Sequence, residues 1–219
     1  MNSYLHGPSL IPLLGETIGE NLRRTVERFG ERDALVVRHQ DYRATYRQLW
    51  DATSLLARAL IASGVQTGDR VGIWSPNRFE WVITQYATAR IGAILVNINP
   101  AYKTSELQYA LTQSGISLLI HAKAFRTSDY VQMVKEVRIN CPELRETITI
   151  DTQWTALLRR ADGVAERELA DRESQLQFDD PINIQYTSGT TGFPKGATLS
   201  HHNILNNGCL VGEMIKYTE

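Results

Sequence analysis

The sequence predicts an α/β protein in which layered, mostly parallel sheets carry helices on both faces. Short apolar segments alternate with amphipathic segments of roughly 10 to 15 residues, a pattern typical of β-α-β units. The apolar segments, such as residues 116–120, show no alternation of polar and apolar residues, so helices must cover both faces of their sheet. With 219 residues and a hydrophobic fraction of 42%, the chain is long enough for one large domain.

The amino-terminal quarter of the chain predicts two helices separated by a short strand. Apolar residues spaced four, four and three apart indicate a helix over residues 18–29. A β-prone run at 34–37 indicates a strand. Thr45 is placed to cap a second helix that extends to about Ser63, where Gly64 supplies the stop.

Strands and helices alternate through the rest of the chain. Strands are expected at residues 69–75, 93–99, 116–122, 147–150 and 181–186. Helices are expected at residues 77–91, 104–114, 129–139 and 152–160, and again after Ser200. The charged segment 161–177 is expected to form a solvated helix or a loose surface connection whose charges face water.

The composition excludes some functions. The formal net charge is −1, so no overall basic field favours nucleic-acid binding. Cys141 and Cys209 lie far apart and are expected to be free thiols. No segment has the roughly 18 to 20 apolar residues of a membrane span, and the first residues do not resemble a secretory signal. We therefore expect a cytoplasmic protein with at most a peripheral membrane association, whose oligomeric state the sequence does not indicate.

The segment after the last predicted strand, TSGTTGFPKG, concentrates groups that bind phosphate. Its glycines let backbone amides approach phosphate oxygens closely, and its hydroxyls are donors or hard ligands for Mg²⁺. Segments of this composition are often plain surface loops, but the added lysine favours phosphate binding. It is no Walker A loop, because Gly196 follows the lysine. The candidate binding residues are Thr187, Ser188, Gly189, Thr190, Thr191, Gly192, Phe193, Pro194 and Lys195.

The run YTSGTTGFPKG at 186–196 resembles the signature loop of the adenylate-forming superfamily, which includes acyl-CoA synthetases, adenylation domains and luciferases. The segments PLLGETIGENL, GDRVGIWSPN and GAILVNINPAY are similar to the fatty-acyl-CoA synthetase branch, most of all to medium-chain acyl-CoA ligases. The resemblance implies an acid–thiol ligase that uses ATP to convert a fatty acid to acyl-adenylate and then, with coenzyme A, to acyl-CoA. It also implies that the loop holds the β- and γ-phosphates and that Thr187 contacts Mg²⁺.

The resemblance also carries an expectation about length, because chains of this family are more than twice as long. Residues 1–219 are therefore expected to be the amino-terminal portion of the AMP-binding large domain. They would lack the later segments that hold adenine and ribose, and the carboxy-terminal lid with its adenylation lysine. No catalytic residue is assigned in this chain, and the chain alone is expected to be inactive.

Three alternatives remain open at this stage. The chain could come from another adenylate former, such as an aryl-CoA ligase or a peptide-synthetase adenylation domain. It could be a non-catalytic nucleotide-binding remnant. A simple P-loop ATPase or kinase is disfavoured by Gly196. His201 and His202, which follow the helix-start Ser200, are expected to serve in capping and packing rather than in catalysis.

Overall fold

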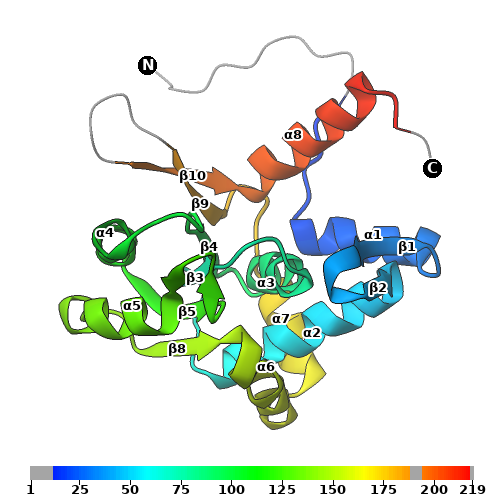
Figure 1. The fold of residues 1–219 in the computed structure, drawn as a ribbon. Coiled ribbons are helices and arrows are strands. Elements are labelled where there is room, and N and C mark those ends of the chain that lie inside the picture. Colours follow the sequence, from blue (N-terminus) through cyan, green and yellow to red (C-terminus); the bar gives the residue numbers. More distant parts are fainter. Residues whose placement is uncertain (1–11, 188–193, 218–219) are drawn as a thin grey trace.

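The computed structural model describes residues 12–187 and 194–217, and its centre is a six-stranded sheet (Figure 1). Its strands are β3 (Arg70–Trp74), β4 (Ile94–Asn97), β5 (Ile116–His121), β8 (Glu146–Thr149), β9 (Pro181–Thr187) and β10 (Lys195–Ser200). The spatial order is β10-β9-β4-β3-β5-β8, and every neighbouring pair is parallel except β9 with β10. The predicted α/β class with a mostly parallel sheet is confirmed.

Helices cover both faces of this sheet, as the uniformly apolar strands predict. One face packs against α1 (Ile18–Phe29), α2 (Tyr46–Ala62), α3 (Phe79–Arg90), α6 (Ile150–Arg159) and α7 (Glu166–Glu173). The other face packs against α4 (Thr104–Ser114) and α5 (Tyr130–Val137). The last helix, α8 (His201–Met214), follows β10. Short 3-10 turns occupy Arg38–Gln40, Arg138–Asn140 and Arg160–Gly163.

The two cores are separated by the alternation of side chains along each strand. In β3, Val71 and Ile73 enter the core beneath α2 and α3, whereas Trp74 enters the core beneath α4 and α5. Trp74 stacks there on Tyr130, with ring centroids 3.4 Å apart. Gly72 is required on the same side, because an added Cβ would lie 2.9 Å from a methyl group of Leu119. The sheet is therefore closely packed with apolar side chains on both faces.

Helix boundaries follow the local signals in the sequence. Thr45 caps α2 through its Oγ1, and the Gln48 side chain returns the interaction, which forms a capping box. α4 ends at Gly115, whose φ of 63° is costly for any residue with a Cβ. The cap predicted at Thr45 and the helix expected over residues 104–114 are confirmed. Two antiparallel pairs were not predicted: β1 (Asp33–Val37) with β2 (Tyr42–Thr45), and β6 (Ala124–Phe125) with β7 (Ser128–Asp129).

The charged segment 161–177 is anchored more firmly than its composition suggests. It contains α7, which buries Leu169 in the core beneath the sheet. Glu173 accepts a hydrogen bond of 2.5 Å from the guanidinium of Arg90, whose side chain is only 2% exposed. The same guanidinium donates to Thr53 and lies 3.6 Å from the centre of the Trp50 ring. The expectation that these charges simply face water is wrong for Glu173, because a buried arginine needs a counter-charge.

Two expectations about the whole chain can be compared with the part that the structure describes. Cys141 is buried and Cys209 is partly buried, and both are free thiols as expected. None of the described helices has the length and apolar character needed to cross a membrane.

Candidate phosphate-binding site

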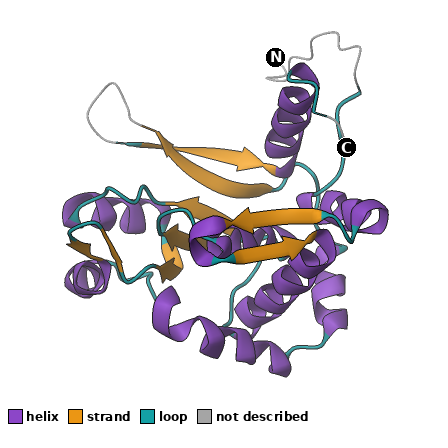
Figure 2. Cartoon of the chain, turned by 45° about the vertical axis from the view of Figure 1, so that its right-hand side comes forward, coloured by secondary structure: helices purple, strands orange, loops and turns teal. Residues whose placement is uncertain are grey.

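The predicted phosphate-binding residues lie at the end of a hairpin formed by β9 and β10. Thr187 is the last residue of β9 and Lys195 is the first of β10, and the two are direct partners across the antiparallel pair. The parallel pairing of β9 with β4 ends at Gln185, so the last residues of β9 extend past the edge of the sheet (Figure 2). This edge is the carboxyl end of the parallel strands, where open α/β sheets bind their ligands.

The helix expected after Ser200 is confirmed, but the strand that lies between the glycine-rich loop and this helix was not predicted. Lys195–Ser200 form β10, and the helix begins one residue later. Lys195 therefore lies on a strand, where backbone pairing with β9 holds its Cα in place. Of the predicted binding residues, Thr187, Pro194 and Lys195 are described, whereas Ser188, Gly189, Thr190, Thr191, Gly192 and Phe193 lie outside the described residues.

Thr187 and Lys195 are both exposed to solvent, one with a hydroxyl group and the other with an ammonium group. The Thr187 hydroxyl donates a hydrogen bond of 3.4 Å to the Lys195 carbonyl. That bond uses the hydroxyl proton and leaves oxygen lone pairs free for a hard cation. Within residues 12–187 and 194–217, the Lys195 ammonium makes no ion pair. A lysine and a threonine on paired, exposed strand positions are suited to binding a phosphate and its metal ion.

Helix α4 supports the base of the hairpin through two tyrosines. The Tyr109 hydroxyl donates to the Pro194 carbonyl at 3.2 Å, and the Tyr186 hydroxyl donates to Gln113 Oε1 at 2.9 Å. The two rings meet edge to face, with centroids 6.4 Å apart. Burial raises the pKa of Tyr186 further above neutral pH, where a tyrosine hydroxyl is already protonated and can donate. Sequence reasoning missed Tyr109, since nothing local on α4 indicates a contact with a residue 85 positions later.

On the other side of the hairpin, α8 is fixed through its first turn. Ser200 caps the helix by accepting from the backbone amide of Asn203. His201 is fully buried, and its Nδ1 accepts a hydrogen bond of 3.1 Å from the backbone amide of Ile18. Burial lowers the pKa of His201 to about 4, so the imidazole is neutral near pH 7. The packing role predicted for His201 agrees with these contacts.

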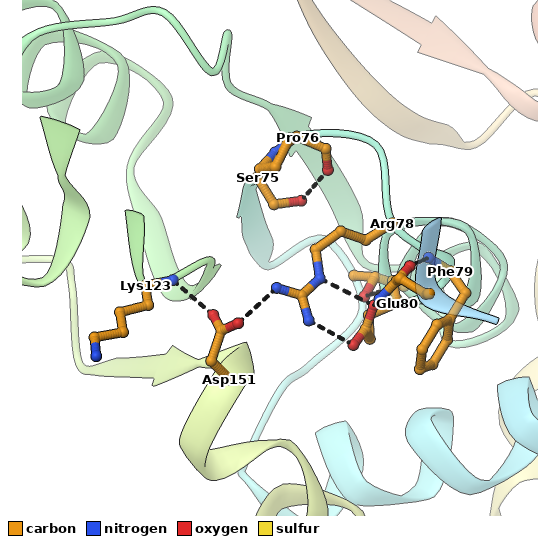
Figure 3. Close-up of polar contacts among 9 residues, drawn as sticks. Ser75, Pro76, Arg78, Phe79, Glu80, Lys123 and Asp151 are labelled. Carbon is orange, nitrogen blue, oxygen red and sulfur yellow. Dashed lines mark hydrogen bonds and ion pairs between the residues drawn. The ribbon is translucent and has the colours of Figure 1, made fainter. Parts of the chain in front are cut away.

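A second polar group, which we call the Arg78 network, lies at the same edge of the sheet and consists of Arg78, Glu80, Lys123 and Asp151 (Figure 3), together with Gln40. The Arg78 guanidinium makes two hydrogen bonds to Glu80, of 2.9 and 3.1 Å, and one of 2.9 Å to Asp151. Asp151 also accepts from the backbone amide of Lys123 at 2.7 Å, and Glu80 accepts from Gln40 at 3.0 Å. Burial alone would raise the pKa of Asp151, but these hydrogen bonds outweigh it and lower the pKa. Arg78, Glu80 and Asp151 use one another as partners, and with the backbone amide of Lys123 they connect the segments that follow β3, β5 and β8.

With only the described residues as ligands, a metal ion at this site would need phosphate oxygens or water to complete its coordination. Among the described residues, no group of three His, Cys, Asp or Glu side chains could hold a metal ion. Mg²⁺ commonly takes only one or two protein ligands and completes its shell with phosphate oxygens and water. The hydroxyl of Thr187 suits that role, because it is exposed and lies opposite a lysine that can hold the same phosphate.

Comparison with known proteins identifies the family of the chain. The AMP-binding enzyme family matches residues 22–218. The medium-chain acyl-CoA ligase ACSF2, mitochondrial, of Mus musculus is 40% identical over 98% of this chain, which covers 38% of that protein. The putative acyl-CoA synthetase YngI of Bacillus subtilis is 36% identical over 94% of this chain and 41% of its own length. The chain thus spans about two fifths of these relatives.

Solved structures give the same result for the fold. A long-chain-fatty-acid-CoA ligase from Archaeoglobus fulgidus superimposes with a TM-score of 0.82 and 25% identity, covering 99% of this chain and 43% of the other. The anthranilate CoA ligase AuaEII, in complex with anthranoyl-AMP, has a TM-score of 0.73 and 25% identity over 88% of this chain and 36% of its own. From the hairpin geometry, the family match and these folds together, the chain belongs to the AMP-binding enzyme family.

Proposed function

We propose that this chain supplies the phosphate-binding part of an ATP-dependent fatty-acyl-CoA ligase. The observation that carries the proposal is the position of Thr187 and Lys195, paired and exposed at the carboxyl edge of the sheet in a chain of the AMP-binding enzyme family. The 40% identity to medium-chain acyl-CoA ligases supports a fatty acid as the acid that is activated. The substrates are then a fatty acid, ATP and coenzyme A.

The proposed chemistry assigns each described residue a defined task. A carboxylate attacks the α-phosphate of ATP, forming acyl-adenylate and releasing pyrophosphate, and the thiol of coenzyme A later displaces AMP. Lys195 neutralises charge that builds on the departing pyrophosphate, which is how proteins usually assist phosphate chemistry. Thr187 provides an oxygen ligand for the Mg²⁺ that accompanies ATP. The amides of the intervening loop, Ser188 to Phe193, complete the phosphate cradle in this proposal.

We further propose that residues 1–219 act as one structural unit and that this unit alone binds Mg·ATP without forming acyl-CoA. The support is that the chain covers only 38% of the mouse and human relatives that it matches. Purified chain incubated with ATP, a fatty acid and coenzyme A should therefore give no acyl-CoA above a Lys195→Ala background. We also propose a cytoplasmic location for this protein. The mouse and human relatives are named as mitochondrial, and that location is a property of those proteins.

A second candidate substrate class is an aromatic acid, which the fold match to an anthranilate CoA ligase supports. The lower identity of that match, 25% against 40%, favours the fatty acid. The two classes are distinguished by measuring turnover with a panel of fatty and aromatic acids. The protein used should match the full length of the family's enzymes. Faster turnover with benzoate-type acids than with fatty acids of medium length would reverse the assignment.

Calorimetric titration of the purified chain with Mg·ATP tests the phosphate-binding proposal. We expect saturable binding that Lys195→Ala weakens by about tenfold, since a charged hydrogen bond to phosphate contributes about 1.5 to 3 kcal/mol. The matched control is Lys135→Ala, which removes an exposed lysine from α5 and should leave the Kd unchanged. Equal affinities of the wild type and Lys195→Ala would refute the assignment of Lys195.

A further inference from the structure

The segment that precedes α1 is bound to the first turns of α8 by side chains that lie far away in the sequence. We call this contact the amino-terminal clasp and define it by Leu14, Ile18, His201, His202 and Asn206. Figure 1 shows the blue segment before α1 running beside α8. The partners are separated by 183 to 192 positions in the chain, so only the folded structure brings them together.

Asn206 recognises the backbone of Leu14 at two points. Its Oδ1 accepts from the Leu14 amide at 2.8 Å, and its Nδ2 donates to the Leu14 carbonyl at 3.0 Å. A side-chain amide has the same donor and acceptor groups as a peptide bond, so this pair satisfies both backbone groups of an extended residue. Asn206 is only 7% exposed, and loss of the pair would leave its amide in a buried place without these partners.

His201 adds a second attachment point one turn away. Its Nδ1 accepts from the amide of Ile18, the first residue of α1, while its own backbone amide bonds to the carbonyl of Asp180, just before β9. His201 thus joins the starts of α1, β9 and α8. The buried apolar cluster at this junction is small, with Ile18, Ala89 and Ile182, and Ile204 and Leu205 of α8 pack against it. The polar contacts of the clasp and this small cluster therefore attach α8 together.

The position of α8 affects the proposed phosphate site, because β10 connects the two. Ser200 is both the last residue of β10 and the cap of α8, so the helix start and the strand cannot move independently. The other end of β10 is Lys195. On its far side β10 has no neighbouring strand in the described sheet, so its described attachments include the pairing with β9, the Tyr109–Pro194 hydrogen bond next to Lys195, and the clasp next to Ser200.

We propose that Asn206 and His201 are positioning residues for the phosphate-binding hairpin, acting by clasping the backbone of Leu14 and Ile18. This inference rests on the proposed function of Thr187 and Lys195. A clasp that opens lets β10 shift relative to β9, and the binding-competent arrangement is then populated for only a fraction of the time. The apparent affinity for a polyphosphate falls by the same fraction.

Two substitutions open the clasp from opposite sides, and each has a matched control. Asn206→Ala removes the side-chain amide, and Leu14→Pro removes the backbone amide that donates to it. Leu13→Pro is the control for the second, since Leu13 is 39% exposed and precedes the clasp. Leu169→Ala controls for general destabilisation, because Leu169 is buried on α7, distant from the hairpin.

The experiment combines hydrogen exchange of residues 181–187 and 195–200 with calorimetry of Mg·ATP at a temperature where every variant is folded. We expect both clasp variants to accelerate exchange in the hairpin and to raise the Kd about tenfold. Both controls should leave the hairpin exchange and the Kd unchanged. Hairpin exchange that stays at the wild-type rate in the clasp variants, or that rises equally in Leu169→Ala, would overturn the proposal. If the wild type binds no Mg·ATP, the proposed function fails, while the exchange rates still decide whether the clasp positions the hairpin.

Discussion

The Arg78 network and the β9–β10 hairpin lie at the same edge of one sheet but differ in whether their charged side chains form ion pairs. In the network, the side chain of Arg78 is 18% exposed and that of Glu80 6%, and the charged side chains of Arg78, Glu80 and Asp151 pair with one another, whereas Lys123 contributes its backbone amide. At the hairpin, Lys195 and Thr187 are exposed, and Lys195 has no ion pair among the described residues. Charge that is compensated internally stabilises the fold, whereas charge left uncompensated at a ligand-binding edge is available for a ligand.

The largest effect that we expect comes from breaking the network. Arg78→Ala leaves the nearly buried carboxylate of Glu80 without its cation, which should lower the free energy of unfolding by about 3 to 5 kcal/mol. Urea unfolding measures this loss. Arg145→Ala is the control, because its pair with Asp69 involves an arginine side chain that is 58% exposed and should contribute within about 1 kcal/mol. If Arg78→Ala also weakened Mg·ATP binding while folded, the network would belong to the ligand site.

A smaller effect should appear at the first turn of α8 as a dependence of the folding stability on pH. Burial holds the pKa of His201 at about 4, below its ordinary value of 6.5. Between these pH values the unfolded chain binds a proton that the folded chain excludes, so stability is fully present above pH 6.5 and is lost as the pH falls towards 4. The loss should be on the order of 3 kcal/mol.

Unfolding of His201→Asn measured across this pH range isolates the contribution, because asparagine retains an acceptor but does not titrate. We expect the free energy of unfolding of His201→Asn to change less with pH than that of the wild type. His39→Asn, which replaces an exposed histidine, should keep the wild-type slope. If the free energy of unfolding changed with pH equally in the wild type and in His201→Asn, His201 would not be the buried neutral group described above.

The smallest expected effect is at Lys195 itself. Because the side chain is exposed and has no ion pair in the described part of the chain, Lys195→Ala should change the free energy of unfolding by less than about 0.5 kcal/mol. The same urea titration provides this value. A loss comparable to that of Arg78→Ala would place Lys195 in the scaffold and remove the contrast between the two regions.

The sheet and most helix ends could be predicted because their signals are local. Thr45 with Gln48 begins α2, and Gly115 ends α4, as short-range capping rules require. The strand β10 was missed because its residues, KGATLS, are mostly exposed and lack an apolar pattern. Its pairing with β9 comes from the hairpin connection and not from burial.

The candidate site was only partly predictable, because its geometry depends on strand pairing and on contacts between residues far apart in the sequence. The loop composition indicated Thr187 and Lys195, but not that backbone pairing places them opposite each other. The ion pair of Arg90 with Glu173 joins residues 83 positions apart, so neither local charge pattern indicates it. Contacts of this kind depend on tertiary packing, which periodicity and capping signals do not encode.

The central claim is that the Thr187–Lys195 hairpin binds the β- and γ-phosphates of ATP, and the most direct measurement compares three ligands by calorimetry. Mg·ATP, Mg·pyrophosphate and AMP are each titrated into the wild type and into Lys195→Ala. The claim predicts that ATP and pyrophosphate bind to the wild type, that both are weakened by Lys195→Ala, and that any affinity for AMP is unaffected by the substitution. Binding of AMP that depends on Lys195, with no affinity for pyrophosphate, would contradict it.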